Sequence, residues 1–292
     1  IKGPFCHLHV HTQYSILQAT PDVESLVMKA KELGMPAVAM TDHGNLMGAF
    51  KFVRAALKND IMPIVGCEFY VAVDRKRTQF TKHEPDKRFN QVLLAKNKKG
   101  YLNLAKLSSL GYMEGLYGIH PRIDKDLIAE YKEDVVALTG NLQGEIPNLI
   151  LNVGEDEAEN AFLWWLEIFG ENFYVELIRH GLDEENHVNR ILLQFARKYK
   201  VKVIASNDVY YLDKKNSDAH DILLCIRDGE SQETPIGRGR GFRFGFPNQE
   251  FYFKTEEEMK ILFSDLPEAI ENISALVDQF ESYKLESEVL LP

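Results

Sequence analysis

The sequence lacks any run of about 18 consecutive apolar residues, the length that a membrane-spanning helix needs. It also lacks a basic start followed by an apolar core, so no secretory signal peptide is indicated. Its three cysteines, Cys6, Cys67 and Cys225, are odd in number and far apart, which argues against a disulfide framework and against a zinc ribbon. We therefore expect a cytoplasmic protein that has no membrane partner.

Positive charge is in deficit, with 34 Lys and Arg residues against 44 Asp and Glu residues. The net charge of −10 argues against a protein that coats nucleic acid with its whole surface, although it leaves room for local basic patches. A hydrophobic content of 45% over 292 residues is sufficient for a sizeable core. The chain opens with Ile rather than Met, which indicates a piece of a longer protein or a processed chain.

What is present, close to the amino end, is a run of alternating histidines, His7-Leu8-His9-Val10-His11-Thr12. Side chains of a β-strand alternate between two faces, so the three imidazoles are expected to point the same way, about 7 Å apart from neighbour to neighbour. Neutral imidazole is the commonest zinc ligand and packs poorly in an apolar strand. The alternative is a set of hydrogen-bonded histidines in a core or on a wet face, and the spacing favours metal ligands.

Short apolar runs and helical patterns alternate along the rest of the chain. The expected strands are residues 7–12, 37–40, 64–71, 91–95, 135–139, 173–178 and 203–208. The expected helices are residues 23–33, 46–57, 102–112, 146–151, 158–169, 186–199, 255–263 with Thr255 as a cap, and 266–280. Such strands, separated by helices and without a glycine-rich dinucleotide loop, favour a closed barrel of parallel strands over an open Rossmann sheet.

In barrels of this type, functional side chains collect where the strands end. The side chains expected at one mouth, with Glu68 no more than about 15 Å from His9, are those of His9, His11, His43, Glu68 and Asp208. Imidazole and carboxylate ligands together suit zinc or manganese. A cluster of them can bridge two or three ions and activate water against a phosphoester.

Several motifs occur in an order that resembles the polymerase and histidinol phosphatase (PHP) domain of the bacterial DNA polymerase III alpha subunit. They are His-Leu-His-Val-His-Thr, Thr-Asp-His-Gly-Asn-Leu, Gly-Cys-Glu, Pro-Arg-Ile-Asp, Ala-Ser-Asn-Asp-Val and Ala-His-Asp-Ile-Leu-Leu-Cys-Ile. The resemblance covers essentially the whole chain. It implies an α/β fold, a distorted (β/α)7 TIM-like barrel of PHP type. The barrel is expected over residues 1–228, with a basic loop and helical extension toward the polymerase palm over residues 229–292.

The same resemblance implies a part in DNA replication, within a DNA-directed DNA polymerase, which is a nucleotidyltransferase. The expected partners are the remainder of the alpha chain, DNA held by the full-length protein, and replisome subunits such as a separate proofreading exonuclease. The polymerase aspartates of the family lie beyond Pro292, so this chain is not expected to polymerise DNA. Related stand-alone domains are phosphoesterases, and in some of these polymerases the domain is implicated in metal-dependent 3′–5′ exonuclease activity.

Carried over position by position, the resemblance implies metal ligands at His9, His11, His43, Glu68 and Asp208. At four further positions a neutral side chain replaces an expected ligand: Gln18 for Asp, Asn90 for His, Asn141 for Cys or His, and Tyr210 for His. Five of nine positions thus survive, which leaves at most one ion with a tetrahedral set of protein ligands.

Two functions remain open. In the one we favour, the barrel is a catalytically silent, structural part of the polymerase, with one sub-stoichiometric zinc or manganese ion or none. In the other it retains exonuclease or phosphoesterase activity, with His9, His11 and Asp208 as the catalytic candidates.

Two basic segments are candidates for binding nucleic acid. The first contains Arg75, Lys76 and Arg77, and the second, Gly237 to Phe244, interleaves Arg238, Arg240 and Arg243 with glycines and aromatic rings. Such arrays can hold phosphates and stack bases. The alternative for both is an ordinary solvated loop.

Overall fold

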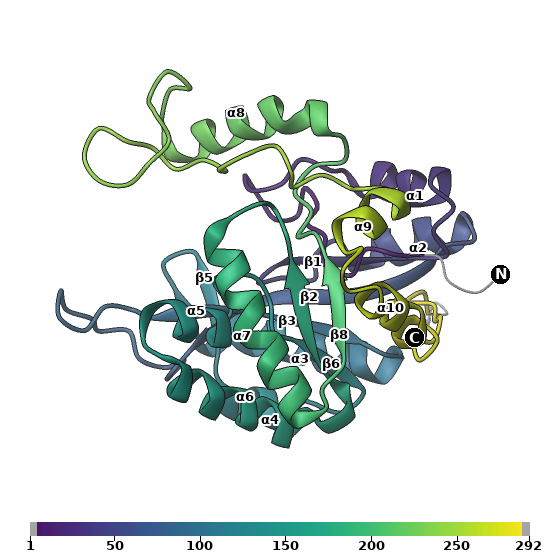
Figure 1. Ribbon diagram of the computed structural model, residues 1–292, viewed down its shortest axis with the longest axis horizontal. Helices are drawn as coiled ribbons and strands as arrows, with labels where there is room; N and C mark the ends of the chain where they lie inside the picture. The colour runs from purple at the N-terminus through teal and green to yellow at the C-terminus, as the bar shows by residue number, and fades with distance from the viewer. Residues whose placement is uncertain (1–4, 288–292) are drawn as a thin grey trace, which may run out of the picture.

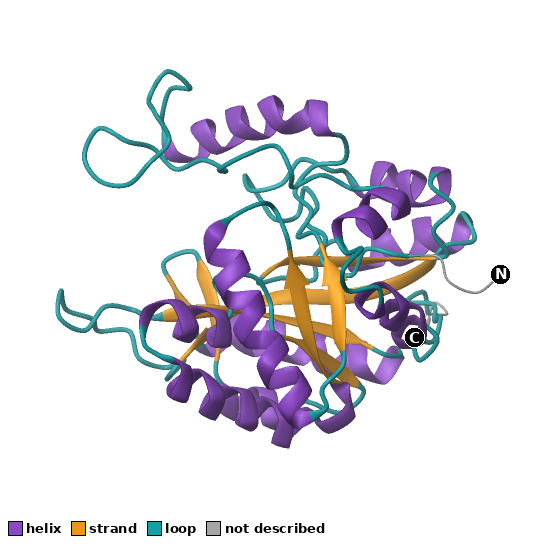
Figure 2. Ribbon diagram, viewed as in Figure 1, coloured by secondary structure: helices purple, strands orange, loops and turns teal. Residues whose placement is uncertain are grey.

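The computed structural model describes residues 5–287, with strands at the centre and most helices around them (Figure 2). The strands are β1 (Ala37–His43), β2 (Met62–Ala72), β3 (Arg88–Ala95), β4 (Leu116–Tyr117), β5 (His120–Ile123), β6 (Val135–Leu138), β7 (Phe173–Ile178) and β8 (Val203–Ser206). The α-helices are α1 (Val23–Glu32), α2 (Ala49–Lys58), α3 (Lys98–Glu114), α4 (Lys125–Glu130), α5 (Glu145–Asn152), α6 (Glu155–Phe169), α7 (Asp183–Tyr199), α8 (Ser217–Asp228), α9 (Glu256–Leu262) and α10 (Glu268–Val277). Short 3-10 turns cover Gly170–Asn172 and Lys214–Asn216. None of the helices within residues 5–287 is long and apolar enough to cross a membrane.

The strands form one sheet that runs β4-β5-β2-β3-β6-β7-β8, with β1 also paired to β2. The segment that carries the alternating histidines closes this sheet into a barrel. On one side Ala39 N donates to His7 O and Thr41 N donates to Val10 O. On the other side Val10 forms a parallel bridge with Val209, just beyond β8. The predicted distorted seven-stranded barrel is confirmed, although its first member makes a single bridge rather than a full strand.

The expectation that all seven strands run parallel is wrong for β3, which pairs antiparallel with both β2 and β6. The chain between β2 and β3 contains no helix that could carry it back along the sheet, and parallel neighbours need such a crossover. The reversal has a consequence for the barrel mouth. Asn90, near the start of β3, lies opposite Tyr70, near the end of β2.

The helices expected from apolar periodicity are all present within a few residues of their predicted bounds. Helix α1 starts at an Asp22 cap, and α9 starts at Thr255, whose side chain accepts the Glu258 N–H while the Glu258 carboxylate accepts the Thr255 N–H. Helices α4 and α8 and the short strands β4 and β5 were not predicted. Helix α8 lies above the barrel (Figure 1), and it buries His220, Leu224 and Cys225 while leaving Ile222 and Ile226 exposed, so its apolar side chains do not share one buried stripe.

The carboxyl-terminal helices pack into the same core as the barrel. Met259, Phe263 and Ile273 are fully buried in that core, and Asn272 Nδ2 donates to Val203 O in β8. Helix α10 therefore covers β8 (Figure 1). The division of the chain at residue 228 stays a prediction.

The basic loop between β2 and β3 is tied to the barrel by one buried cation. The Arg122 side chain is 0% exposed, pairs with Asp86 at 2.9 Å and donates to the carbonyls of Arg75, Arg77 and Gly115. The loop therefore has a fixed anchor.

Replacing Arg122 with Ala should lower the free energy of unfolding by about 3–5 kcal/mol, because it removes a fully buried side chain that donates to three carbonyls and leaves the Asp86 carboxylate with Arg88 alone. The matched control is Arg88→Ala, which removes the more exposed partner of the same carboxylate and should cost under about 1 kcal/mol. Urea unfolding measures both changes. Equal costs would contradict the anchoring role.

Candidate metal centre

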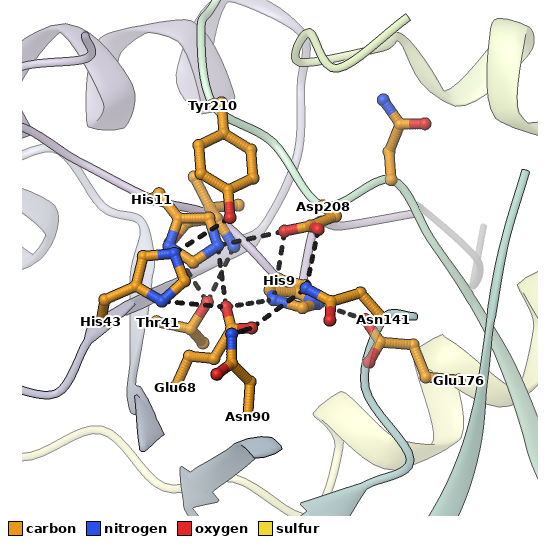
Figure 3. A network of polar contacts seen from close by, with 12 residues as sticks. His9, His11, Thr41, His43, Glu68, Asn90, Asn141, Glu176, Asp208 and Tyr210 are labelled. Atoms are coloured by element: carbon orange, nitrogen blue, oxygen red, sulfur yellow. Dashed lines mark hydrogen bonds and ion pairs between the residues drawn. The ribbon is translucent and has the colours of Figure 1, made fainter. Parts of the chain in front are cut away.

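Two imidazoles and two carboxylates meet at the barrel mouth, as predicted from the strand ends. His9 and His11 come from the closing segment, Glu68 from β2, and Asp208 from the turn after β8, where its φ is +47°. One ligand atom from each lies within 4.8 Å of all the others (Figure 3). His9 Nε2 is 2.9 Å from Glu68 Oε2, which confirms that the two residues share one site.

The separations within this group suit a single ion. His11 Nε2 lies 2.9 Å from Glu68 Oε2 and 3.0 Å from Asp208 Oδ1. In tetrahedral zinc sites with bonds of about 2.0–2.2 Å, neighbouring ligand atoms are roughly 3.3–3.5 Å apart. A small outward movement of these side chains is enough to admit one ion. A zinc or manganese ion there would act as a Lewis acid and lower the pKa of a bound water.

The amide side chains at the altered positions hydrogen-bond the carboxylates. Asn141 Nδ2 donates to Glu68 Oε1 and to Asp208 Oδ2, both at 3.0 Å, and Asn90 Nδ2 donates to Glu68 Oε1 at 3.2 Å (Figure 3). An N–H group that donates to a carboxylate cannot also donate electrons to a metal. In this arrangement Asn90 and Asn141 therefore turn N–H groups rather than lone pairs toward the carboxylates.

His43 and Tyr210 form the outer side of the site. Burial lowers the pKa of His43 to about 4, so the ring is neutral, and its Nε2 is hydrogen-bonded to the Tyr210 hydroxyl, 3.0 Å away. His11 is stacked between the two rings, at centroid distances of 4.3 Å to His43 and 4.2 Å to Tyr210. His43 Nδ1 is 3.8 Å from Glu68 Oε2 and has no hydrogen-bond partner among the described residues. The last predicted site position, Gln18, lines the cavity above this group.

Opposite charges hold the four central side chains together. Burial alone would lower the pKa of His11, but hydrogen bonds to Asp208 and Glu68 raise it to about 9. Burial opposes charge at His9 too, and the carboxylates of Asp208, Glu176 and Glu68 raise its pKa well above the usual value. Burial would raise the pKa of Glu68, yet the imidazoles of His9 and His11 that contact its carboxylate hold it well below its ordinary value. Without an ion, the cluster of His9, His11, Glu68 and Asp208 is thus a buried network of imidazolium and carboxylate groups.

Two acidic residues of the site were not predicted. Glu176 in β7 accepts a hydrogen bond from His9 Nδ1 at 2.6 Å, which fixes the orientation of that ring. Asp42, at the end of β1, accepts bonds from Thr12 and Ser15 and so shapes the turn after the histidines. Glu176 interrupts a continuously apolar strand, as Glu68 does, and this was the available signal, whereas Asp42 lies between Thr41 and His43 after an apolar run.

The expectation that His7 shares the direction of His9 and His11 is not met. His7 Nε2 is bonded to Lys254 O at 2.7 Å, and its ring packs between Phe5 and Phe253. The segment is irregular, with a single bridge at Val10, so strict alternation of side chains does not hold along it.

A cavity of about 370 Å³ opens above the cluster. Its lower wall carries amides and imidazoles, including Asn90, Asn141 and His180. Its upper wall is formed by Arg227 of α8 and by Phe244 and Phe246 of the segment that follows. This volume is near the lower end of the range for small-molecule pockets.

The candidate nucleic-acid-binding residues, five arginines and Lys76, differ in whether they pair with a carboxylate. Arg75 contacts Glu114 and Asp124, Arg77 pairs with Glu84, and Arg243 makes a bidentate pair with Asp221. Lys76, Arg238 and Arg240 are exposed.

A closed α/β barrel with a histidine and carboxylate cluster at its mouth is the arrangement of a barrel domain with a possible metal-binding site. The PHP domain family matches residues 7–180, and the chain belongs to this family. It is similar to DNA polymerase III subunit alpha of Borreliella burgdorferi, with 40% identity over 97% of this chain and 24% of that protein. The subunit of the same name from Thermus aquaticus is 42% identical over 92% of this chain and 21% of its own length. The chain thus spans about a quarter of these relatives.

Among solved structures, a predicted metal-dependent phosphoesterase from Bifidobacterium adolescentis aligns with a TM-score of 0.42 and 16% identity, over 88% of this chain and 95% of that one.

With chelator present, the free energy of unfolding should fall as the pH rises from about 6.5 to about 9. His9 and His11 have folded pKa values above their unfolded values, so their stabilisation is complete below the unfolded pKa and is lost as pH rises through the folded pKa. His7 and His43, with pKa values lowered to about 4, change their charge only below this window. Urea unfolding across the window measures the slope, and His11→Gln should reduce it. A flat wild-type profile would contradict the charged network.

Proposed function

We propose that this chain is the PHP domain of a DNA polymerase III alpha subunit and that its main role there is structural. The observation that carries the proposal is the Asn141 amide, which bridges Glu68 and Asp208 with two hydrogen bonds of 3.0 Å. It supplies donors to the carboxylates at a position where the family places a ligand. Together with Asn90 and the Tyr210 hydroxyl, it supplies hydrogen bonds to Glu68, Asp208 and His43 without an ion.

The proposed metal chemistry follows from the same contacts. His9, His11, Glu68 and Asp208 would hold at most one zinc or manganese ion, bound sub-stoichiometrically, and His43 would lie beside it. Water activation between two bridged ions needs a second set of ligands, and Gln18, Asn90, Asn141 and Tyr210 are poor ones. We therefore propose that exonuclease and phosphoesterase activity is lost.

The proposed partners are those of the relatives' whole subunit: the remainder of the alpha chain, DNA, and other replisome subunits, including a separate proofreading exonuclease. The name of the relatives supports the remainder of the alpha chain as a partner. Nearly the full length of this chain, 97%, aligns with 24% of a polymerase subunit. Polymerisation itself belongs to the longer protein.

Protein purified without chelator should contain well under one zinc or manganese ion per chain. Its melting temperature should change little with chelator, because hydrogen bonds already stabilise the pocket. It should not trim a single-stranded or mismatched 3′ end when manganese or zinc is supplied. Elemental analysis, thermal melting and a gel assay measure these three results.

The matched variant restores the four expected ligands with Gln18→Asp, Asn90→His, Asn141→His and Tyr210→His. It should gain bound ions and become sensitive to chelator, because it replaces amide donors and a phenol with metal ligands. The proposal fails if the wild type holds two or three tight ions, or trims 3′ ends in a way that His9→Ala abolishes. Either result would support the retained phosphoesterase.

A further inference from the structure

Helix α8 and the segment after it extend beyond the barrel and lie over its mouth (Figure 1). We define the arm as residues 234–247. Its sequence, Thr-Pro-Ile-Gly-Arg-Gly-Arg-Gly-Phe-Arg-Phe-Gly-Phe-Pro, contains three arginines and no carboxylate. In a chain of net charge −10, a segment with this composition is a local site of positive charge.

The arm is held in a defined shape rather than being an unstructured loop. Gly237 N donates to Arg243 O and Arg243 N donates to Pro235 O, both at 3.0 Å. Gly239 and Gly241 have φ values of +90° and +87°, which side chains larger than glycine rarely adopt. A Cβ at Gly237 would lie 2.4 Å from Phe242 Cδ1, so the glycine lets that ring pack on the backbone.

Arg243 and the other two arginines have different roles. The Arg243 guanidinium makes two bonds to the Asp221 carboxylate, at 2.7 and 2.9 Å, and a third to Thr234 O. This buried pair fastens the arm to α8, and it uses the charge of Arg243 within the protein. Arg238 and Arg240 lie exposed between the glycines, where their charge faces solvent.

Two aromatic rings next to these cations are also exposed. Phe242 is 48% exposed and Phe244 is 53% exposed, although burial of such rings is strongly favourable. The Arg227 guanidinium lies 5.0 Å from the Phe244 ring centroid. Phe244 also meets Phe246 edge to face, and Phe246 meets Tyr210 in the same way, so a row of rings leads from the arm to the cluster.

We propose that the arm binds single-stranded nucleic acid, with phosphates on Arg238 and Arg240 and bases stacked on Phe242 and Phe244. Exposed arginines alternating with exposed aromatic rings match the two chemical features of a single strand, its charged backbone and its unpaired bases. A protein partner or the rest of the polymerase chain would cover the apolar rings but would not require the cations. The inference goes beyond the structural role proposed above, and the metal content of the cluster does not bear on it.

The test uses the full 292-residue chain and a fluorescent oligothymidylate of about 20 nucleotides, longer than the site size of a typical single-strand-binding fold. Anisotropy titrations over a series of salt concentrations give the affinity and its salt dependence. We expect binding at low salt that weakens steeply as salt rises, and weaker binding to a duplex of the same length. An oligouridylate of equal length shows whether the arm distinguishes DNA from RNA.

The variant Arg238→Ala/Arg240→Ala should weaken binding and reduce the slope of log affinity against log salt by about 1.4, since each phosphate contact on a single strand contributes about 0.7. The matched control, Arg197→Ala/Lys202→Ala, removes the same charge from two exposed residues. Arg197 lies near the end of α7 and Lys202 lies just before β8, both far from the arm (Figure 1). This control should leave the slope unchanged.

The ring variants test stacking separately from charge. Phe244→Ala should weaken binding about five- to 150-fold while leaving the salt slope unchanged, and Phe244→Tyr, which keeps a ring, should retain the affinity. Melting temperatures confirm that each variant is folded. The proposal is overturned if the wild type does not bind at low salt, if the arm and control variants lose affinity equally, or if duplex and single strand bind alike.

Discussion

The constraint on which the site depends is the burial of negative charge at the barrel mouth. Glu68, Asp208 and Glu176 are all nearly inaccessible to solvent, and an isolated carboxylate in such a place is costly. Positive charge must therefore lie among them, and only protons on His9 and His11 or a bound cation can provide it. The same four ligand atoms serve both, so proton and metal compete for one place.

The altered positions shift that competition toward the proton. A His or Cys ligand offers a lone pair toward an ion, whereas Asn90 and Asn141 direct N–H groups at the carboxylate oxygens. Each amide stabilises the charged carboxylate directly, which lessens what an ion can add. These hydrogen bonds hold the residues of the barrel mouth together without a metal ion, as the proposed structural role requires. Removing one partner from such a network lowers the stability of the fold more than replacing the whole network with apolar residues, because it leaves a buried charge without a partner.

Most of the fold could be predicted because apolar runs and helical periodicity record burial directly. The predicted strands at 37–40 and 203–208, for instance, correspond to β1 and β8, and Asp208 at the end of the second reaches the cluster. The direction of β3 was missed because it depends on the connection before it, a loop whose anchor, Arg122, lies far along the chain. His7 was misplaced because alternation holds only in a regular strand. Glu176 was missed because a single acidic residue in an apolar strand does not reveal its partner.

The role of each arginine in the arm depends on its tertiary contacts as well as on the local sequence. Its three arginines are equivalent in the sequence, yet Asp221 of α8 neutralises Arg243 and leaves Arg238 and Arg240 facing solvent. The same pair fixes the backbone between Phe242 and Phe244, so one ion pair both positions the rings and separates the structural arginine from the exposed ones. Pre-positioned rings lose little conformational entropy when a base stacks on them. A glycine-rich segment is usually too flexible to be a good binding surface. Because the Arg243 and Asp221 pair fixes its backbone, this one presents its rings and cations in a defined position above the barrel mouth.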